Sequence, residues 1–222
     1  MTDAHCHVPC GDGSVREFVV GRDFFGVHPW EVVARPDLVP SEVVQSVRAS
    51  ILSHPGAGVG EIGLDRLKER TITAAMREVF EVQLDLAAEL CRPVVLHGAK
   101  CWGQVVEAVR RLVGRTAASG QAFLFHGFSR SDGLMPDIVG LNGYISVGPA
   151  ILNDHAVNYR ALARKIPADR LLVETDRTAE NASECPHVRD VLAKLAEIRG
   201  DDFHSLVEQT DANATRFLAG AA

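Results

Sequence analysis

The 222-residue sequence has no apolar run that approaches the roughly 20 residues of a membrane-spanning helix. It also has no linker, no low-complexity stretch and no repeat of fixed period, which argues against disordered, collagen-like and coiled-coil proteins. A signal peptide is not apparent, because Asp3 and His5 interrupt the N-terminus. These absences predict a cytoplasmic protein with no membrane association and a single domain over residues 1–222.

Positive charge is scarce as well, because 23 Lys and Arg stand against 29 Asp and Glu, a formal net charge of −6. A protein that binds the phosphate backbone of duplex nucleic acid usually has a basic surface. The negative net charge therefore argues against binding of this kind. It leaves open a nuclease whose positive charge comes from bound metal. The five cysteines are odd in number and scattered, which predicts free thiols. No segment points to an obligate protein partner.

Short apolar segments that mostly end in Gly, His or a carboxylate predict eight β-strands. They cover residues 2–7, 17–20, 24–28, 58–64, 93–97, 122–126, 143–147 and 171–175. Apolar residues at helical spacing predict helices over residues 41–53, 75–90, 103–112, 156–165, 187–199 and 203–217. Continuously apolar strands that alternate with helices indicate an α/β fold with a parallel sheet, and eight strands indicate a TIM-type (β/α) barrel.

The first third of the chain departs from this alternation. About nine residues separate the first strand from the second, and only residues 21–23 separate the second from the third. A parallel crossover usually takes about a dozen residues, whereas a hairpin takes two to five. We therefore expect a barrel reduced at its N-terminus, with the first two helices missing and an antiparallel second strand.

The first strand ends in Asp3-Ala-His5-Cys-His7, with the two histidines two residues apart. Side chains at this spacing in a strand face the same way, so both imidazoles point into the barrel and can chelate one metal ion. Taken alone, the pattern is equally compatible with histidines that have no metal to bind.

Polar residues end three further strands and interrupt a fourth. Glu61 lies in the otherwise apolar segment 60–65, where a buried carboxylate must coordinate a metal or pair with an internal Arg. His97 and His126 each end an apolar strand, where either one alone is also compatible with a core histidine. Asp176 ends another strand, with helix capping as its alternative. With the two histidines of the first strand, these residues suit two divalent ions bridged by one carboxylate, in a pocket that attracts anions.

Taken in order, the motifs resemble those of TatD-family metal-dependent hydrolases, within the wider amidohydrolase group of barrels. They are DAHCH at 3–7, GVHPWE at 26–31, GEIGLD at 60–65, PVVLH at 93–97, FHGFS at 125–129, IPADRLLVETD at 166–176 and NATRFL at 213–218. Members of this family are metal-dependent DNases, often exonucleases, and some relatives act on aminoacyl-tRNA.

The resemblance implies roles for single residues and a cofactor of two divalent ions. The ligand types leave the metal open among zinc, magnesium and manganese, because imidazoles suit zinc and carboxylates accept the other two. The implied ligands are His5, His7 and Asp176 for one ion, and His97 and His126 for the other, with Glu61 bridging the two. The resemblance also places His28, from GVHP, beside the ions as a contact to the substrate phosphate.

Three segments depart from the family pattern. The family's HSR is HGAK here, which leaves Lys100 near the position of the missing Arg. The Gly that usually follows FS is Arg130, and the usual ETDAP is ETDRT, which adds Arg177. All three are candidate phosphate contacts, with a solvated surface charge as the alternative.

The resulting hypothesis is a deoxyribonuclease that hydrolyses a phosphodiester with a metal-bridging hydroxide. Asp176 ligates an ion and accepts or orients the proton of the water, Glu61 bridges the ions, and His28 holds the phosphate. The acidic charge and the lack of a basic run favour single-stranded DNA or DNA ends over long duplexes. Two alternatives stay open, namely a carbonyl or ester hydrolase such as an aminoacyl-tRNA deacylase, and a non-catalytic metal-binding barrel.

Three further residues have candidate roles beside the ions. Asp65 and Glu174 are candidates for hydrogen bonds to metal-bound histidines, with a salt bridge or helix cap as the alternative. Trp30 is a candidate for stacking on a base, with packing at the rim as the alternative.

Overall fold

The computed structural model describes residues 1–116, 120–129 and 132–220. Its strands are β1 (Thr2–Cys6), β2 (Arg16–Val19), β3 (Phe24–Phe25), β4 (Gly58–Asp65), β5 (Val94–Ala99), β6 (Phe123–Phe125), β7 (Gly143–Val147) and β8 (Leu171–Val173). Its α-helices are α1 (Pro29–Ala34), α2 (Pro40–Ser53), α3 (Ala74–Glu89), α4 (Trp102–Arg115), α5 (Met135–Gly140), α6 (Val157–Lys165), α7 (Val188–Arg199) and α8 (Phe203–Ala219). Short 3-10 helices are η1 (Asp132–Leu134), η2 (Pro149–Leu152) and η3 (Ala168–Arg170).

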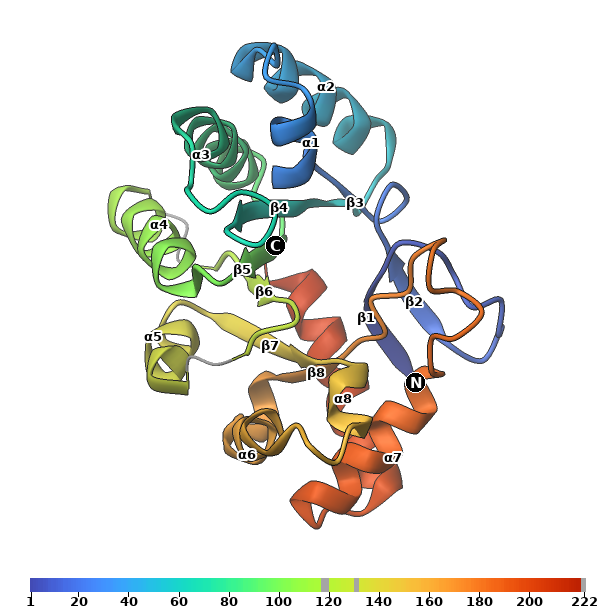
Figure 1. Cartoon of the computed structure of the whole chain (residues 1–222). Coiled ribbons are helices and arrows are strands. Elements are labelled where there is room, and N and C mark those ends of the chain that lie inside the picture. Colours follow the sequence, from blue (N-terminus) through green and yellow to red (C-terminus); the bar gives the residue numbers. More distant parts are fainter. Residues whose placement is uncertain (117–119, 130–131, 221–222) are drawn as a thin grey trace.

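The described strands pair in parallel and follow one another around a ring (Figure 1). Strands β3 to β8 form one sheet in sequence order, and β1 pairs with β2. A bridge between Val20 and Phe24 links β2 to β3. The N–H of Asp176 donates to the carbonyl of His5 at 3.0 Å, which links the segment after β8 to β1. The fold is a TIM-type barrel, and the expected strands are confirmed with ends displaced by a few residues.

The prediction of an antiparallel second strand is wrong. β2 pairs with β1 in parallel, with Asp3 opposite Glu17 and Cys6 opposite Val19. The physical reason is that residues 7–15 return along β1 without a helix. An extended chain of nine residues spans up to about 30 Å, which is more than the length of the five-residue strand β1.

The short connection from β2 to β3 also preserves the strand direction. The N–H groups of Arg22 and Asp23 both donate to the carbonyl of Val19, so the chain makes one tight turn there. Phe24 then lies beside Val20, and the two-residue strand β3 continues in the same direction. The prediction that the first two helices are missing is confirmed, because no helix occurs between β1 and β3, a stretch that the structure describes completely.

Helices surround the ring except beside β1 and β2, where loops take their place (Figure 1). Helix α3 illustrates why these segments are helical. Thr73 caps it by accepting a hydrogen bond from the N–H of Met76 at 3.1 Å, and Met76, Phe80 and Leu84 are buried on one side of the helix. The six-residue helices α1 and α5 were not predicted, because they are too short for a periodic pattern.

An apolar cluster fills the amino-terminal end of the barrel. It contains Ala4, Phe18, Phe24, Val95, Leu124, Tyr144 and Leu172 from the strands, with Ala214 and Phe217 from α8. The ring of Phe217 stacks on that of Phe24 at a centroid distance of 5.9 Å. Helix α8 thereby closes this end, which leaves the carboxyl ends of the strands as the open face. Among the described helices, none has the length and apolar character needed to span a lipid bilayer.

Candidate metal centre

A single buried carboxylate, that of Glu61 on β4, lies at the centre of the open face. Ring nitrogens of five histidines lie 2.6–3.4 Å from its two oxygens. These histidines are His5 on β1, His7 just after β1, His28 just before α1, His97 on β5 and His126 just after β6. Gly63 lets β5 pair closely with β4, because a Cβ there would lie 2.0 Å from the carbonyl oxygen of His97. The structure therefore brings together residues far apart in the sequence.

Asp176 completes the cluster on the β8 side. Its Oδ1 lies 3.6 Å from the Nε2 atoms of both His5 and His7. Its φ of 49° is a left-handed conformation that aspartate rarely adopts. Two hydrogen bonds hold it there, from its own N–H to the carbonyl of His5 at 3.0 Å and from Asn181 Nδ2 to its carbonyl at 3.3 Å. The carboxylate stays half exposed toward the open face.

Asp65 orients one of the histidines. The ring Nε2 of His97 lies 2.8 Å from Asp65 Oδ2, while Nδ1 of the same ring faces Glu61 at 2.7 Å. The indole N–H of Trp30 donates to the same oxygen of Asp65 at 2.8 Å. Trp30 is thus fixed at the rim, with Lys68 Nζ 4.7 Å from the centroid of its ring. The expected contact between Asp65 and a histidine of the cluster is present.

Glu174 occupies the equivalent position behind His126. Its Oε1 lies 3.6 Å from His126 Nδ1, and Ser146 on β7 donates its hydroxyl proton to the other oxygen. All three side chains are buried. Sequence reasoning missed Ser146, although a polar residue inside the apolar strand β7 was a usable signal.

Burial and charge oppose each other in this cluster. Burial raises the pKa of Glu61, but His126 and His5 lower that pKa well below its usual range. Burial lowers the pKa of His126, but Glu61 and Glu174 raise it well above its usual value. The cluster thus favours the ionised form of Glu61, the form in which a carboxylate binds a cation.

His28 differs from the other histidines because it also caps α1. Its Nδ1 accepts a hydrogen bond from the N–H of Trp30 at 3.1 Å, while the carboxylate of Glu31 accepts from the N–H of His28. Burial lowers the pKa of His28, which favours the neutral ring. Because Nδ1 is the acceptor, the ring proton is on Nε2, the nitrogen that faces Glu61 at 3.4 Å. His28 is thus a hydrogen-bond donor toward the cluster.

The three basic residues predicted to contact phosphate have different outcomes. Lys100 is exposed directly after β5, with a φ of 57° and no ion pair with a described residue. Arg130 lies outside the described residues. Arg177 lines a different cavity, of about 300 Å³, together with Asp3 and Cys185. The structure therefore does not bring Arg177 into the histidine cluster.

A basic loop follows β4 at the mouth of the barrel and was missed in the sequence. Arg66, Lys68 and Arg70 are all exposed there, and none pairs with an acidic side chain among the residues that the structure describes. By contrast, Arg110 and Arg111 on α4 are ion-paired. The signal in the sequence was three cations within five residues. The expectation that the chain lacks a basic run did not take this loop into account.

Imidazoles and carboxylates gathered at the carboxyl ends of the strands of a parallel barrel define the class of metal-dependent hydrolases. The chain belongs to the TatD related DNase family, whose model matches residues 17–219. It is accordingly a metal-dependent, DNase-type hydrolase that acts on ester bonds.

Two relatives illustrate this membership. The 3′-5′ ssDNA/RNA exonuclease TatD of Pectobacterium atrosepticum is 27% identical over 203 residues, which cover 86% of this chain and 75% of the relative. The uncharacterized metal-dependent hydrolase YabD of Bacillus subtilis is 29% identical over 169 residues, which cover 72% of this chain and 64% of the relative.

Solved structures agree on the fold. The crystal structure of YJJV, a TatD homolog from Escherichia coli, superposes with a TM-score of 0.71 at 23% identity and covers 91% of this chain and 76% of that chain. An uncharacterized amidohydrolase from Saccharomyces cerevisiae gives a TM-score of 0.70 at 16% identity, with 91% and 80% covered. At these identities the likeness establishes the barrel alone.

Proposed function

We propose that this chain is a deoxyribonuclease that holds two divalent ions in the cluster around Glu61. The observation that carries the proposal is the contact of that one carboxylate with five imidazoles at 2.6–3.4 Å. His5, His7 and Asp176 place ligand atoms within 4.8 Å of one another, which suits one ion. His97 and His126 would hold the other, and Glu61 would bridge the two.

The donor set supports this assignment. His5 Nε2 is buried without a hydrogen-bond partner, as expected of a nitrogen whose lone pair is directed at a cation. Asp65 and Glu174 stand behind His97 and His126, as partners of metal-bound imidazoles commonly do. We propose zinc, magnesium or manganese, because imidazoles favour the first and carboxylates accept the other two.

Asp176, Glu61 and His28 would then share the catalytic work. When bound, the ions would supply a water of lowered pKa and would offset charge on the phosphate. Asp176 would accept the proton that this water loses, and its half-exposed carboxylate is open to it. The water oxygen would attack phosphorus as the bond to the leaving oxygen breaks, and the leaving oxygen would take a proton from solvent. His28 would donate its Nε2 proton to a phosphate oxygen.

The substrate we propose is single-stranded DNA or a DNA end. A net charge of −6 is unfavourable for long duplexes, whereas the loop with Arg66, Lys68 and Arg70 offers a few phosphate contacts. Lys100 is a further candidate contact, and Arg130 and Arg177 stay candidates on their sequence positions alone. The relative from Pectobacterium atrosepticum is named an exonuclease of single-stranded DNA and RNA, which supports the same substrate here.

The organisation of the chain is part of this proposal. We propose one domain over residues 1–222, supported by strands from Thr2 to Val173 in one ring and by α8 packed across it. We propose a cytoplasmic location, which is supported by five cysteines that are all free.

The decisive experiment is digestion of end-labelled single-stranded DNA by protein reconstituted with each metal in turn. Asp176→Asn should lower the cleavage rate by about 100-fold or more, the usual contribution of a general base. Asp137→Asn, on the outer helix α5, is the matched control and should cleave normally. Wild-type protein with two bound ions and no cleavage would contradict the deoxyribonuclease and favour a carbonyl ester as substrate.

A further inference from the structure

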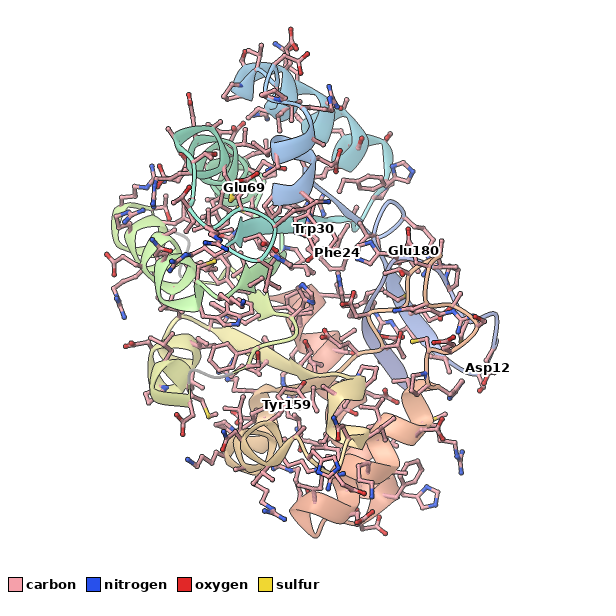
Figure 2. The ribbon with its side chains drawn as sticks, viewed as in Figure 1. Asp12, Phe24, Trp30, Glu69, Tyr159 and Glu180 are labelled. Atoms are coloured by element: carbon pink, nitrogen blue, oxygen red, sulfur yellow. The ribbon has the colours of Figure 1, made fainter. Side chains whose placement is uncertain are left out.

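A cleft of about 1100 Å³ opens beside the candidate metal centre, among the loops after β6, β7 and β8 and helix α6. Glu174 and Asp176 line it where it meets the centre. Tyr159 of α6 is labelled in Figure 2 on the α6 side of the barrel mouth, and it also lines the cleft. Small-molecule pockets begin at roughly 300 Å³, so this cleft has room for a nucleotide.

Two glycines line the cleft near the metal centre. Gly127 and Gly148 both line it, and a Cβ on Gly148 would lie 3.4 Å from Glu174 Oε1. The hydroxyl of Tyr159 accepts a hydrogen bond from the N–H of Gly148 at 2.8 Å, which fixes the ring against this surface. A ligand can therefore pass from the metal centre into the cleft without meeting a large side chain at these two positions.

The walls suit an uncharged ligand. Asn158 provides an amide donor and acceptor, and Val157, 67% exposed, provides apolar surface. Apart from the carboxylates next to the metal centre, the amine and carboxylate among the described lining residues are those of Lys165 and Asp132, which pair at 2.7 Å. Apolar surface with amide groups is what a base and a sugar require, and among the described lining residues no Lys or Arg is left unpaired to bind a phosphate.

The opposite side of the mouth has the reverse character. Strands β4 and β8 are four positions apart in the ring of eight, so the loop after β4 lies across the centre from the cleft (Figure 1). Figure 2 labels Glu69 of that loop and Tyr159 of α6 on opposite sides of the centre. The loop carries the cations Arg66, Lys68 and Arg70. Among the described residues, the unpaired Arg and Lys side chains of this loop thus lie across the mouth from the cleft, whose described Lys is paired.

We propose that the cleft beside α6 binds the terminal nucleoside of the substrate strand, while the phosphates of the remaining strand lie toward the loop after β4. The scissile phosphate then lies between the two, at Glu61 and Asp176. This inference rests on the proposed nuclease activity and adds the site that recognises a strand end. The cleft takes base and sugar, so an uncharged deoxynucleoside such as thymidine is a sufficient ligand for it.

The test is to fill the cleft from its α6 wall with Asn158→Trp. Asn158 is exposed and lines the cleft, so a larger side chain there reduces the space without touching the histidine cluster. The KM for an end-labelled oligonucleotide should rise about tenfold or more, and the inhibition constant of thymidine should rise with it. Bound metal per protein should be unchanged, and so should kcat/KM for bis(p-nitrophenyl) phosphate, which has no nucleoside.

Leu52→Trp is the matched control, because Leu52 is 63% exposed on the outer helix α2. An unchanged oligonucleotide KM and thymidine inhibition in Asn158→Trp would overturn the proposal. If that variant fails to fold, Ala161→Leu on the same wall of the cleft replaces it, with the same expected result. Wild-type protein that hydrolyses neither DNA nor bis(p-nitrophenyl) phosphate would instead contradict the nuclease itself, so the two failures are distinguishable.

Discussion

Trp30 donates its indole N–H to the same oxygen of Asp65 that faces His97 Nε2, both at 2.8 Å. The main chain of Leu67 and Lys68 donates to the other oxygen of Asp65. Both carboxylate oxygens of Asp65 therefore accept hydrogen bonds from groups other than the histidine. This arrangement turns Nδ1 of His97 toward Glu61 and links the rim of the barrel to the candidate metal centre.

The first prediction concerns this link. Asp65→Asn should weaken metal binding about 10- to 100-fold, the usual cost of losing the partner of a metal-bound histidine. Trp30→Phe should have a smaller effect in the same direction, because it removes one donor to Asp65 and keeps an aromatic ring. Metal titration of the purified variants measures both affinities.

Trp102→Phe is the matched control for Trp30→Phe. Trp102 lies on α4 against Phe125 and Phe128, so its replacement should lower stability and leave metal affinity unchanged. Equal metal affinity in Trp30→Phe and wild type would show that Asp65 needs no help from the indole.

Local patterns in the sequence were sufficient to predict the strands and most of the site. His5, Glu61, His97 and His126 each end or interrupt an apolar strand, and a parallel barrel brings the carboxyl ends of its strands to one face. The direction of β2 could not be predicted in this way. It depends on the path of residues 7–15, and loop length alone permits both directions.

The direction of a side chain after a strand end could not be predicted from the sequence either. Asp176 has a φ of 49°, and this single left-handed residue changes the course of the chain just before Arg177. Arg177 then lines the cavity with Asp3 and Cys185, although its neighbour Asp176 faces the histidines. Nothing in the local sequence pattern indicates such a turn, since glycine is the residue that normally adopts it.

The second prediction concerns stability and pH at Asp3. Burial raises the pKa of Asp3 to about 6, although its carboxylate accepts hydrogen bonds from the N–H and the hydroxyl of Thr175. The folded protein therefore binds this proton more tightly than the unfolded chain, whose pKa is near 3.8. The free energy of unfolding should fall as pH rises through about 4 to 7 on account of this group.

Asp3→Asn removes the titration, so the variant should gain stability relative to wild type over that range. A pKa difference between 3.8 and about 6 corresponds to ~3 kcal/mol. Urea unfolding of chelator-treated protein at several pH values measures it, with Asp137→Asn as the exposed control. A stability difference that stays constant with pH would contradict the prediction.

The third prediction concerns the salt dependence of substrate binding. Replacing Lys68 and Arg70 together by Ala should remove two phosphate contacts from the loop after β4. For single strands the slope of log K against log salt is about −0.7 per contact, so the loss of two contacts should make the slope shallower by about 1.4. The KM for a single-stranded oligonucleotide, measured over a range of salt concentrations, gives this slope.

The paired cations of α4 supply the control for that experiment. Arg110 and Arg111 are bound to Asp137 and Glu81 on the outer surface, so replacing both by Ala should leave the slope unchanged. The same change of slope in both double variants would indicate a general effect of net charge, and would place the substrate strand elsewhere than on the loop.

The last prediction concerns the closed end of the barrel. Phe217 of α8 is fully buried and contacts the rings of Phe18, Phe24 and Tyr144 at centroid distances of 5.7–6.4 Å. Phe217→Ala should lower the free energy of unfolding by about 3–5 kcal/mol, because it leaves a cavity among rigid strands. Phe203→Ala at the start of α8 is the control and should cost much less, since Phe203 is only partly buried. Denaturant unfolding measures both, and equal losses would show that α8 stabilises the barrel along its whole length and not through the ring that fills its end.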